Sequence, residues 1–177
     1  MCRLIFISIL FSSFFSCVNE QENFQNKDLL GVFDKESSIK MNKSWIVDEV
    51  FKIDQYCLRQ GWDMLSSESG LRYKILKRSN SGIKASQGND VVISYDIRLM
   101  DSIQTKCYHS DSSGLAMFKV QHSTIESGIH EVVTYLEKND SALVILPHHI
   151  AHGISGDSKL IPPLSTVLYF IKIVDVQ

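Results

Sequence analysis

The stretch at residues 142–176, ALVILPHHIAHGISGDSKLIPPLSTVLYFIKIVDV, decides the fold predicted for this chain. Its first apolar run, 142–146, stops at Pro147, because proline cannot donate a hydrogen bond to a sheet ladder. A second apolar run resumes only after Pro162 and Pro163. The stretch therefore predicts two strands joined by a long loop. Such a loop in a compact domain is uncommon unless it forms part of a binding site.

The second apolar run alternates between the two faces of a strand. One face would carry Val167, Tyr169, Ile171 and Ile173, and the other Leu168, Phe170, Lys172 and Val174. Residues two apart in a strand share a face, and both faces here are mainly apolar. This pattern predicts a strand that is covered on both sides.

Motifs of this stretch resemble, in their order and spacing, the end of an FKBP-type peptidyl-prolyl cis-trans isomerase domain. They are Leu146-Pro147, Ala151-His152-Gly153, Ile161-Pro162-Pro163 and a final strand with an aromatic residue at 166–173. Upstream, Gly88-Asn89-Asp90 is similar to the family's Gly-Asp turn, and Ile125-Glu126-Ser127-Gly128 to the entry of its single helix. The resemblance covers about residues 71–176. It implies an α+β fold, an FKBP-like antiparallel β-sheet wrapped on one α-helix, with an N-terminal helical extension in front of it.

Alternation of apolar and polar residues predicts strands at 71–77 and 91–99. Residues 105–109 resemble the family's next strand, and Phe118 and Val120 indicate a further short one. A helical stripe predicts a helix over 123–138; it consists of Ile125, Ile129, Val132, Val133 and Leu136.

The chain in front of this domain divides into three predicted segments. Residues 1–17 form a signal peptide, 18–43 a polar tether that is disordered or partly helical, and 44–70 a helical extension to the isomerase domain at 71–177. Ser44 can cap a helix that starts at Trp45 and stops near Gly61. Its apolar stripe is formed by Ile46, Val50, Ile53 and Cys57, widened by Val47, Phe51 and Leu58. We expect this helix to dock on the domain, because an isolated helix of this length is marginal in water.

The first 17 residues have the pattern of an export signal. Arg3 precedes an apolar run at 4–15 that ends at Ser16-Cys17, and the run is too short to span a bilayer as a mature helix. The segment resembles a bacterial lipoprotein signal, which implies a lipid on Cys17 and a periplasm-facing protein anchored to a cell-envelope membrane. Phe14 stands where that family usually has Leu. The alternative is ordinary cleavage after Ser16, which would leave a soluble secreted protein.

Composition limits the partners of the chain. With 177 residues, 44% hydrophobic and 21% charged, it is long enough for one domain plus an extension. Its net charge of −2 gives no electrostatic footprint for nucleic acid, so we expect no nucleic-acid partner. The lipid anchor would make a membrane a partner of the chain, in addition to proline-containing polypeptides.

Two cysteines remain once Cys2 leaves with the signal and Cys17 is assigned to lipid. Cys57 and Cys107 have no metal-ligand spacing. They could form a disulfide in an oxidising compartment, or they could be two buried free thiols.

The resemblance implies a reaction that needs no nucleophile and no cofactor. Rotation about an Xaa-Pro amide is slow because resonance must be lost. A twisted amide has lost its delocalised dipole, so an apolar, water-poor pocket favours it over the planar amide, with a hydrogen bond to fix the carbonyl. The substrates would be proline-containing polypeptides, in particular unfolded or partly folded envelope proteins.

By resemblance, residues of two kinds form the pocket. The catalytic positions are Tyr95, Tyr108, Ile129, His152 and Tyr169, and the substrate-binding positions are His109, Ile125, Glu126, Leu160 and Ile161. A further aromatic wall of the family falls on Ala116. Glu126 would offer its backbone N–H to a substrate carbonyl. For Tyr95 and Tyr169 the alternative is plain core packing.

Three positions depart from the family pattern. Ile129 stands where the family has Trp, His152 where it has Tyr, and His109 where it has Asp. The smaller floor at Ile129 implies weaker substrate binding, although His152 can still donate a hydrogen bond.

A metal site is not expected. His148, His149 and His152 lie close together near Asp157, but no recognised zinc motif is present. We interpret these histidines as exposed loop residues, and His122 and His130 as surface residues beside the helix.

The leading hypothesis is a secreted, lipid-anchored isomerase that assists folding of envelope proteins, similar to the lipoprotein isomerases associated with gliding motility. The second is a catalytically weak FKBP-like chaperone or binding module. The third is an unrelated all-β lipoprotein, which would lack a helix packed across the sheet.

Overall fold

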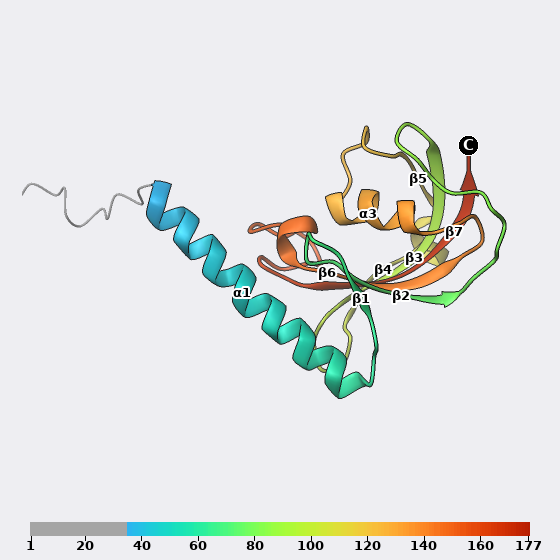
Figure 1. Ribbon diagram of the computed structural model, residues 1–177. Helices are drawn as coiled ribbons and strands as arrows, with labels where there is room; N and C mark the ends of the chain where they lie inside the picture. The colour runs from blue at the N-terminus through green and yellow to red at the C-terminus, as the bar shows by residue number, and fades with distance from the viewer. Residues whose placement is uncertain (1–34) are drawn as a thin grey trace, which may run out of the picture.

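A computed structural model describes residues 35–177, and its architecture is the predicted α+β fold. An antiparallel sheet of seven strands carries a short helix on one face and a long N-terminal helix on the other (Figure 1). The helix packed across the sheet excludes the all-β alternative. The predicted signal peptide, Cys17 and the first part of the tether lie outside the described residues.

The strands along the sheet are β1 (Leu65–Ser66), β2 (Arg72–Lys77), β6 (Ser141–Leu146), β7 (Val167–Val176), β3 (Asp90–Leu99) and β4 (Lys106–His109). β5 (Ala116–Lys119) pairs with β3 on the same edge as β4. The last strand of the chain, β7, is therefore central, because it pairs with β6 on one side and β3 on the other. All strands predicted for the domain are present, and their ends differ from the prediction by at most three residues.

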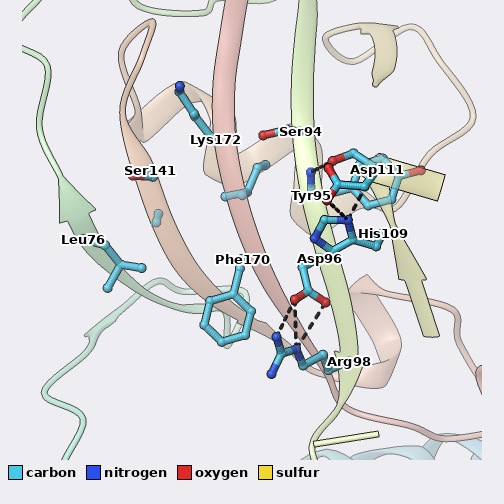
Figure 2. Close-up of a pocket in the computed structure, with 13 residues that line it drawn as sticks. Leu76, Ser94, Tyr95, Asp96, Arg98, His109, Asp111, Ser141, Phe170 and Lys172 are labelled. Atoms are coloured by element: carbon cyan, nitrogen blue, oxygen red, sulfur yellow. Dashed lines mark hydrogen bonds and ion pairs between the residues drawn. The ribbon is translucent and has the colours of Figure 1, made fainter. Parts of the chain in front are cut away.

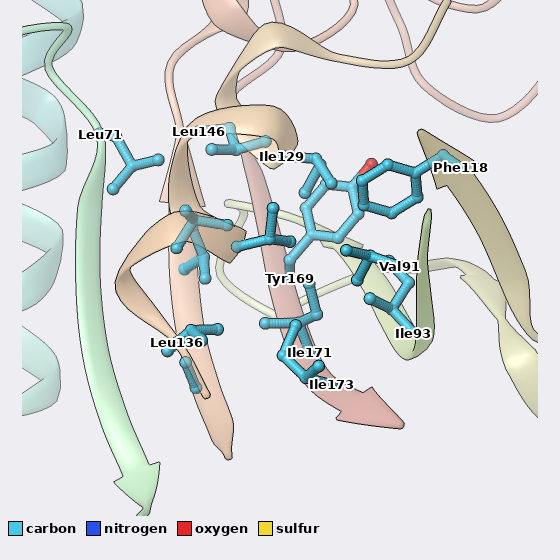
Figure 3. Packing of buried hydrophobic residues seen from close by; sticks show 14 of the residues in the cluster. Leu71, Val91, Ile93, Phe118, Ile129, Leu136, Leu146, Tyr169, Ile171 and Ile173 are labelled. Atoms are coloured by element: carbon cyan, nitrogen blue, oxygen red, sulfur yellow. The ribbon is translucent and has the colours of Figure 1, made fainter. Parts of the chain in front are cut away.

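The core lies between the concave face of the sheet and α3 (Ser127–Val132), which continues as the 3₁₀ turn η1 (Val133–Tyr135) (Figure 3). Gly128 lets this helix approach the sheet, since a Cβ there would lie 2.6 Å from Leu146 Cδ2. The predicted helix at 123–138 was too long. Glu126 is extended, at φ −57° and ψ 131°, so Ile125 belongs to a loop and not to the helical stripe.

The helix α1 (Lys35–Gln60) begins nine residues before the predicted cap at Ser44, so residues 35–43 of the predicted tether are helical. It packs on the outer face of the sheet, where Ile53, Tyr56 and Cys57 meet Ile145 and Leu168. Its first turns extend past the edge of the sheet (Figure 1).

The predicted apolar stripe of α1 was too wide. Val47, Phe51 and Leu58 are exposed, while Ile46 and Val50 are only half-buried. The contact also contains a charged side chain. Within residues 35–177, no helix combines the length and the apolar character that crossing a bilayer requires.

That charge is Glu49, which is buried against the start of the long loop. Its Oε1 accepts hydrogen bonds from the backbone N–H of His148 at 2.7 Å and from Thr166 Oγ1 at 2.6 Å. Its Oε2 lies 2.5 Å from His148 Nδ1. His148 opens the 3₁₀ turn η2 (His148–Ile150). The prediction that His148 is an exposed loop residue was therefore wrong: it is 5% exposed, because Glu49 satisfies its ring inside the contact.

Of the two alternatives for the cysteines, the structure has free thiols. Cys57 is buried in the α1 contact, and Cys107 on β4 is partly exposed.

Candidate active site

A cavity of about 140 Å³ opens between the concave face of the sheet and the N-terminal end of α3. Strands β3, β4, β5 and β7 contribute to its walls, together with the end of the loop before α3. The lining residues are Ile93, Tyr95, Ile97, Tyr108, Ala116, Phe118, Ile125, Glu126, Ile129 and Tyr169. Most of this lining is aliphatic or aromatic, so the cavity provides the water-poor environment that an amide in rotation would need.

The structure brings six of the ten predicted site residues to this cavity. They are Tyr95, Tyr108, Ile125, Glu126, Ile129 and Tyr169, and Ala116 lines it as well. Ile129, 1% exposed, lies on α3, and Tyr169, 3% exposed, comes from the central strand (Figure 3). Both residues also belong to the core, so packing and site are not separate roles for them.

Three lining residues were not predicted as site residues: Phe118, Ile93 and Ile97. Phe118 supplies an aromatic wall on β5, the strand on which Ala116 lies. Residues two apart in a strand share a face, so the wall that the family pattern placed at Ala116 is present two residues further along. An aromatic residue on the same face of the predicted strand was the signal that could have located it.

His109 does not line this cavity. Tyr108 pairs with Ile97 and faces inward, so the next residue of β4 faces the other side of the sheet. There the His109 ring accepts a hydrogen bond from the backbone N–H of Asp111 at 3.0 Å and caps the short helix α2 (Ser110–Ser113). Its predicted contact with substrate has no support in this geometry.

His109 lines a larger, open hollow of about 400 Å³ on the convex face of the sheet (Figure 2). Two of its charged groups pair with each other. Arg98 forms a bidentate pair with Asp96, with Nη2 2.5 Å from Oδ2, and its guanidinium lies 4.9 Å from the centre of the Phe170 ring. We assign the site to the smaller cavity, because its lining is mainly aromatic and aliphatic, whereas the hollow also has charged and hydroxyl side chains, Lys172 and Ser141 among them.

A carboxylate lies at one edge of the apolar cavity. Glu126 Oε1 accepts a hydrogen bond from the Tyr169 hydroxyl at 2.7 Å, and His152 Nε2 lies 2.9 Å from the same oxygen. The Glu126 and His152 side chains are only 17% and 19% exposed. His152 thus reaches the site through Glu126, although it does not line the cavity itself.

This pairing shifts the pKa values of all three groups. Burial opposes ionisation of Glu126, but His152 and Tyr169 hold the pKa of the carboxyl below its usual range. The Glu126 carboxylate raises the pKa of His152, against the effect of burial. Burial and the same carboxylate raise the pKa of Tyr169 well above its usual range. Glu126 is therefore ionised and Tyr169 protonated at neutral pH.

The long loop is attached to the cavity wall through Tyr108, whose hydroxyl donates to Asp157. Asp157 also accepts from the backbone N–H groups of Lys159 at 2.9 Å and Ile161 at 2.8 Å. Burial opposes ionisation of Asp157, but these donors lower its pKa to about 2. Leu160 is 52% exposed and Ile161 is 2% exposed in the core, and neither predicted binding residue lines the cavity.

His130 supports the loop that carries Ile125. Its Nδ1 accepts a hydrogen bond from the backbone N–H of Gln121 at 3.0 Å, and its Nε2 lies 2.9 Å from the carbonyl oxygen of Ser123. An accepting Nδ1 leaves the proton of a neutral ring on Nε2, which then donates to Ser123. His130 is half-buried, so the prediction of a surface residue missed this function.

Glu49, His148 and His149 offer ligand atoms that lie within 4.8 Å of one another. Hydrogen bonds between Glu49 and His148, and between His149 Nε2 and the carbonyl oxygen of Ser69, already engage this cluster. The arrangement is that of a clamp between α1 and the domain, and nothing in it requires a metal ion.

Comparison with known proteins gives the same class as the fold and the cavity. The sequence pattern of the FKBP-type peptidyl-prolyl cis-trans isomerase family matches residues 81–174, more than half of the chain. The chain therefore belongs to this family and carries an FKBP-type isomerase domain.

Two solved structures show the same fold. The crystal structure of FkpA from Escherichia coli matches with a TM-score of 0.62 and 22% identity, over 79% of this chain and 64% of that one. The N-terminal domain of FKBP42 from Arabidopsis thaliana matches with a TM-score of 0.59 and 18% identity, over 65% of this chain and 92% of that domain. The chain thus spans less than two thirds of FkpA.

Proposed function

We propose that the cavity between α3 and the concave face of the sheet is the isomerase site. The observation that carries this proposal is the set of aromatic and aliphatic side chains that surround one small cavity, with Ile129 at its floor. A prolyl ring buried there would leave its amide in an environment that favours the twisted state, which has lost its delocalised dipole. Glu126 would hold the substrate carbonyl through its backbone N–H.

The process served would be the folding of envelope proteins. The pattern of residues 1–17 supports export, and Cys17 supports a lipid anchor that keeps the domain at a membrane surface. The clients would be unfolded or partly folded polypeptides whose folding waits on an Xaa-Pro bond. That step takes tens of seconds or more without a catalyst.

Two assays test this role. Cells that express the chain are labelled with radioactive palmitate, and we expect label on the natural protein but not on Cys17→Ser. The purified chain is then added to an exported protein whose refolding is limited by proline isomerisation, and we expect its slow phase to become faster. Absence of label on the natural protein would contradict the lipid anchor. An unchanged slow phase of refolding would contradict the folding role.

A specific observation favours the second candidate, a weak isomerase that acts mainly as a binding module. The Glu126–His152 pair puts charge at the edge of the cavity, and Ile129 leaves a smaller floor than the family's Trp. Binding of an unfolded, proline-free polypeptide without any acceleration of isomerisation would support this alternative over the first.

A further inference from the structure

The carboxylate of Glu126 has no function in the proposed rotation of an amide, which needs an apolar cavity and a hydrogen-bond donor. It nevertheless lines the cavity, with a side chain only 17% exposed. A buried carboxylate is costly unless a cation or hydrogen bonds compensate it. Its position therefore calls for a positively charged partner.

The rest of the cavity is suited to a cation. None of the residues that line it is a lysine or an arginine, and three tyrosines and one phenylalanine contribute aromatic rings. A carboxylate beside aromatic rings is the environment in which proteins bind ammonium and guanidinium groups. The remaining lining includes Ile93, Ile97 and Ile129, an apolar side that suits a prolyl ring.

The basic group that now faces Glu126 makes no well-directed hydrogen bond to it. His152 Nε2 lies 2.9 Å from Glu126 Oε1, but it is buried without a well-directed hydrogen bond to any residue of the described chain. The Tyr169 hydroxyl supplies the directed bond to the same oxygen. An imidazole held at contact distance without a directed bond can be displaced by a flexible ammonium or guanidinium group that aligns its donors.

We propose that Glu126 makes this cavity selective for polypeptide segments in which a lysine or an arginine stands next to the proline. The prolyl ring would occupy the isoleucine side, and the basic side chain would pair with Glu126 in place of His152. This inference rests on the proposed isomerase site and adds the class of substrate to it.

The experiment compares three peptides that differ only in the residue before proline: lysine, norleucine or glutamate. Norleucine has the carbon chain of lysine without its charge. Isomerisation is followed by exchange NMR with the full chain as catalyst. We expect kcat/KM for the lysine peptide to exceed that for norleucine by about tenfold, the effect of one charge-assisted hydrogen bond, and the glutamate peptide to be the slowest.

Two variants assign the selectivity to a residue. Glu126→Gln keeps the size of the side chain and removes its charge, so the ratio of lysine to norleucine should fall to about one. Glu131→Gln is the matched control: it removes a carboxylate from α3, the helix that follows Glu126. Glu131 accepts from Ser69 Oγ at 2.6 Å and lies outside the cavity lining. The control should keep the preference of the natural chain.

A binding titration with the same peptides keeps this inference separate from the catalytic proposal. A lysine preference in binding without isomerisation would contradict the proposed activity and support the selectivity. Equal values for lysine and norleucine in both assays, or a preference that persists in Glu126→Gln, would overturn the inference.

Discussion

Tyr169 joins the hydrophobic core to the charged edge of the cavity. Its ring packs among core residues on the central strand, while its hydroxyl donates to Glu126 at 2.7 Å. A hydrogen bond to a buried carboxylate contributes more than one between neutral groups, because its acceptor carries a charge.

Tyr169→Phe should lower the free energy of unfolding by about 2 kcal/mol, since it leaves the Glu126 carboxylate with one donor fewer. Urea unfolding at neutral pH measures the change. Tyr73→Phe is the control, because Tyr73 stacks on Tyr135 and its hydroxyl has no hydrogen-bond partner within the described chain. Equal losses in the two variants would show that the bond to Glu126 does not stabilise the fold.

The His152–Glu126 pair gives stability a pH dependence with a definite sign. The pKa of His152 is raised in the folded state, so the folded protein holds this proton more tightly than the unfolded chain. The contribution is fully present below a pH of about 6.5 and is lost as the pH rises through the folded-state pKa. The pKa of Glu126 is lowered, so its contribution is present above a pH of about 4.3 and is lost as the pH falls through the folded-state value.

His152→Gln should therefore remove the loss of stability on the alkaline side. Urea unfolding between about pH 5.5 and 8.5 tests this, because the range brackets the usual titration of histidine. His122→Gln, a change at an exposed histidine, should keep the dependence of the natural chain. A profile for His152→Gln that matches the natural chain would disprove the coupling of these two groups.

Among the elements, α1 is held on the domain by a buried polar contact in addition to its apolar one. Glu49, with a side chain 9% exposed, bonds to His148 and Thr166, which lie before and after the long loop. The helix and both ends of that loop are therefore tied through one carboxylate.

Glu49→Ala should lower the free energy of unfolding by about 3 kcal/mol, because it leaves the buried His148 and the half-buried Thr166 without their acceptor. Amide hydrogen exchange in α1 should become faster at the same time, since the helix loses a tie to the domain. Asp48→Ala, at the exposed neighbouring position, should change neither quantity. Unchanged exchange in Glu49→Ala would mean that the other contacts of α1, such as the apolar contact of Ile53 and Tyr56, are sufficient to hold the helix.

Two glycines of the long loop allow the cost of backbone strain alone to be compared with the cost of strain plus a steric clash. Gly153 and Gly156 both have positive φ, at 68° and 67°. A Cβ at Gly156 would lie 2.2 Å from the Ile161 carbonyl oxygen, whereas one at Gly153 would have nothing within 4 Å. Gly153→Ala should cost about 1–2 kcal/mol for the left-handed backbone. Gly156→Ala should lower the free energy of unfolding clearly more, because its Cβ would also clash with the backbone, and thermal unfolding measures both losses. Equal losses in the two variants would contradict the packing of this loop.

Elements with strict periodicity were predictable from the sequence. Alternation located β3 and the two strands around the Pro-bounded loop to within three residues, because their inner faces are buried. The helix before the domain was placed with its first ten residues, 35–44, missing, because Ser44 has the chemistry of a cap but lies inside α1. A good local capping residue does not end a helix that continues through it.

Site residues that belong to a family motif were predictable from the sequence. Contacts between residues far apart in the chain were not. Tyr95, Tyr108 and Tyr169 fell on the cavity. The buried clamp of Glu49 with His148 spans 99 residues along the chain, and the contact of Glu126 with the Tyr169 hydroxyl spans 43. No local pattern contains either pair. The catalytic functions predicted for Tyr95, Tyr108 and Tyr169 stay predictions.

In the whole molecule, the two faces of the central strand have different partners. Leu168 packs under α1 on the outer face, and the next residue, Tyr169, faces the cavity. The N-terminal helix and the cavity therefore lie on opposite sides of one sheet (Figure 1).

The measurement that tests this account most directly is exchange NMR of an Xaa-Pro peptide with the full chain as catalyst. We expect interconversion faster than the uncatalysed rate. The acceleration should fall at least about tenfold in Tyr95→Ala, which removes a wall of the cavity, a loss of about 1.4 kcal/mol in transition-state stabilisation. Phe170→Ala, on the outer face of β7, should keep it. A folded chain that accelerates no Xaa-Pro peptide, or an acceleration unaffected by Tyr95→Ala, would contradict the assignment of this cavity as an isomerase site.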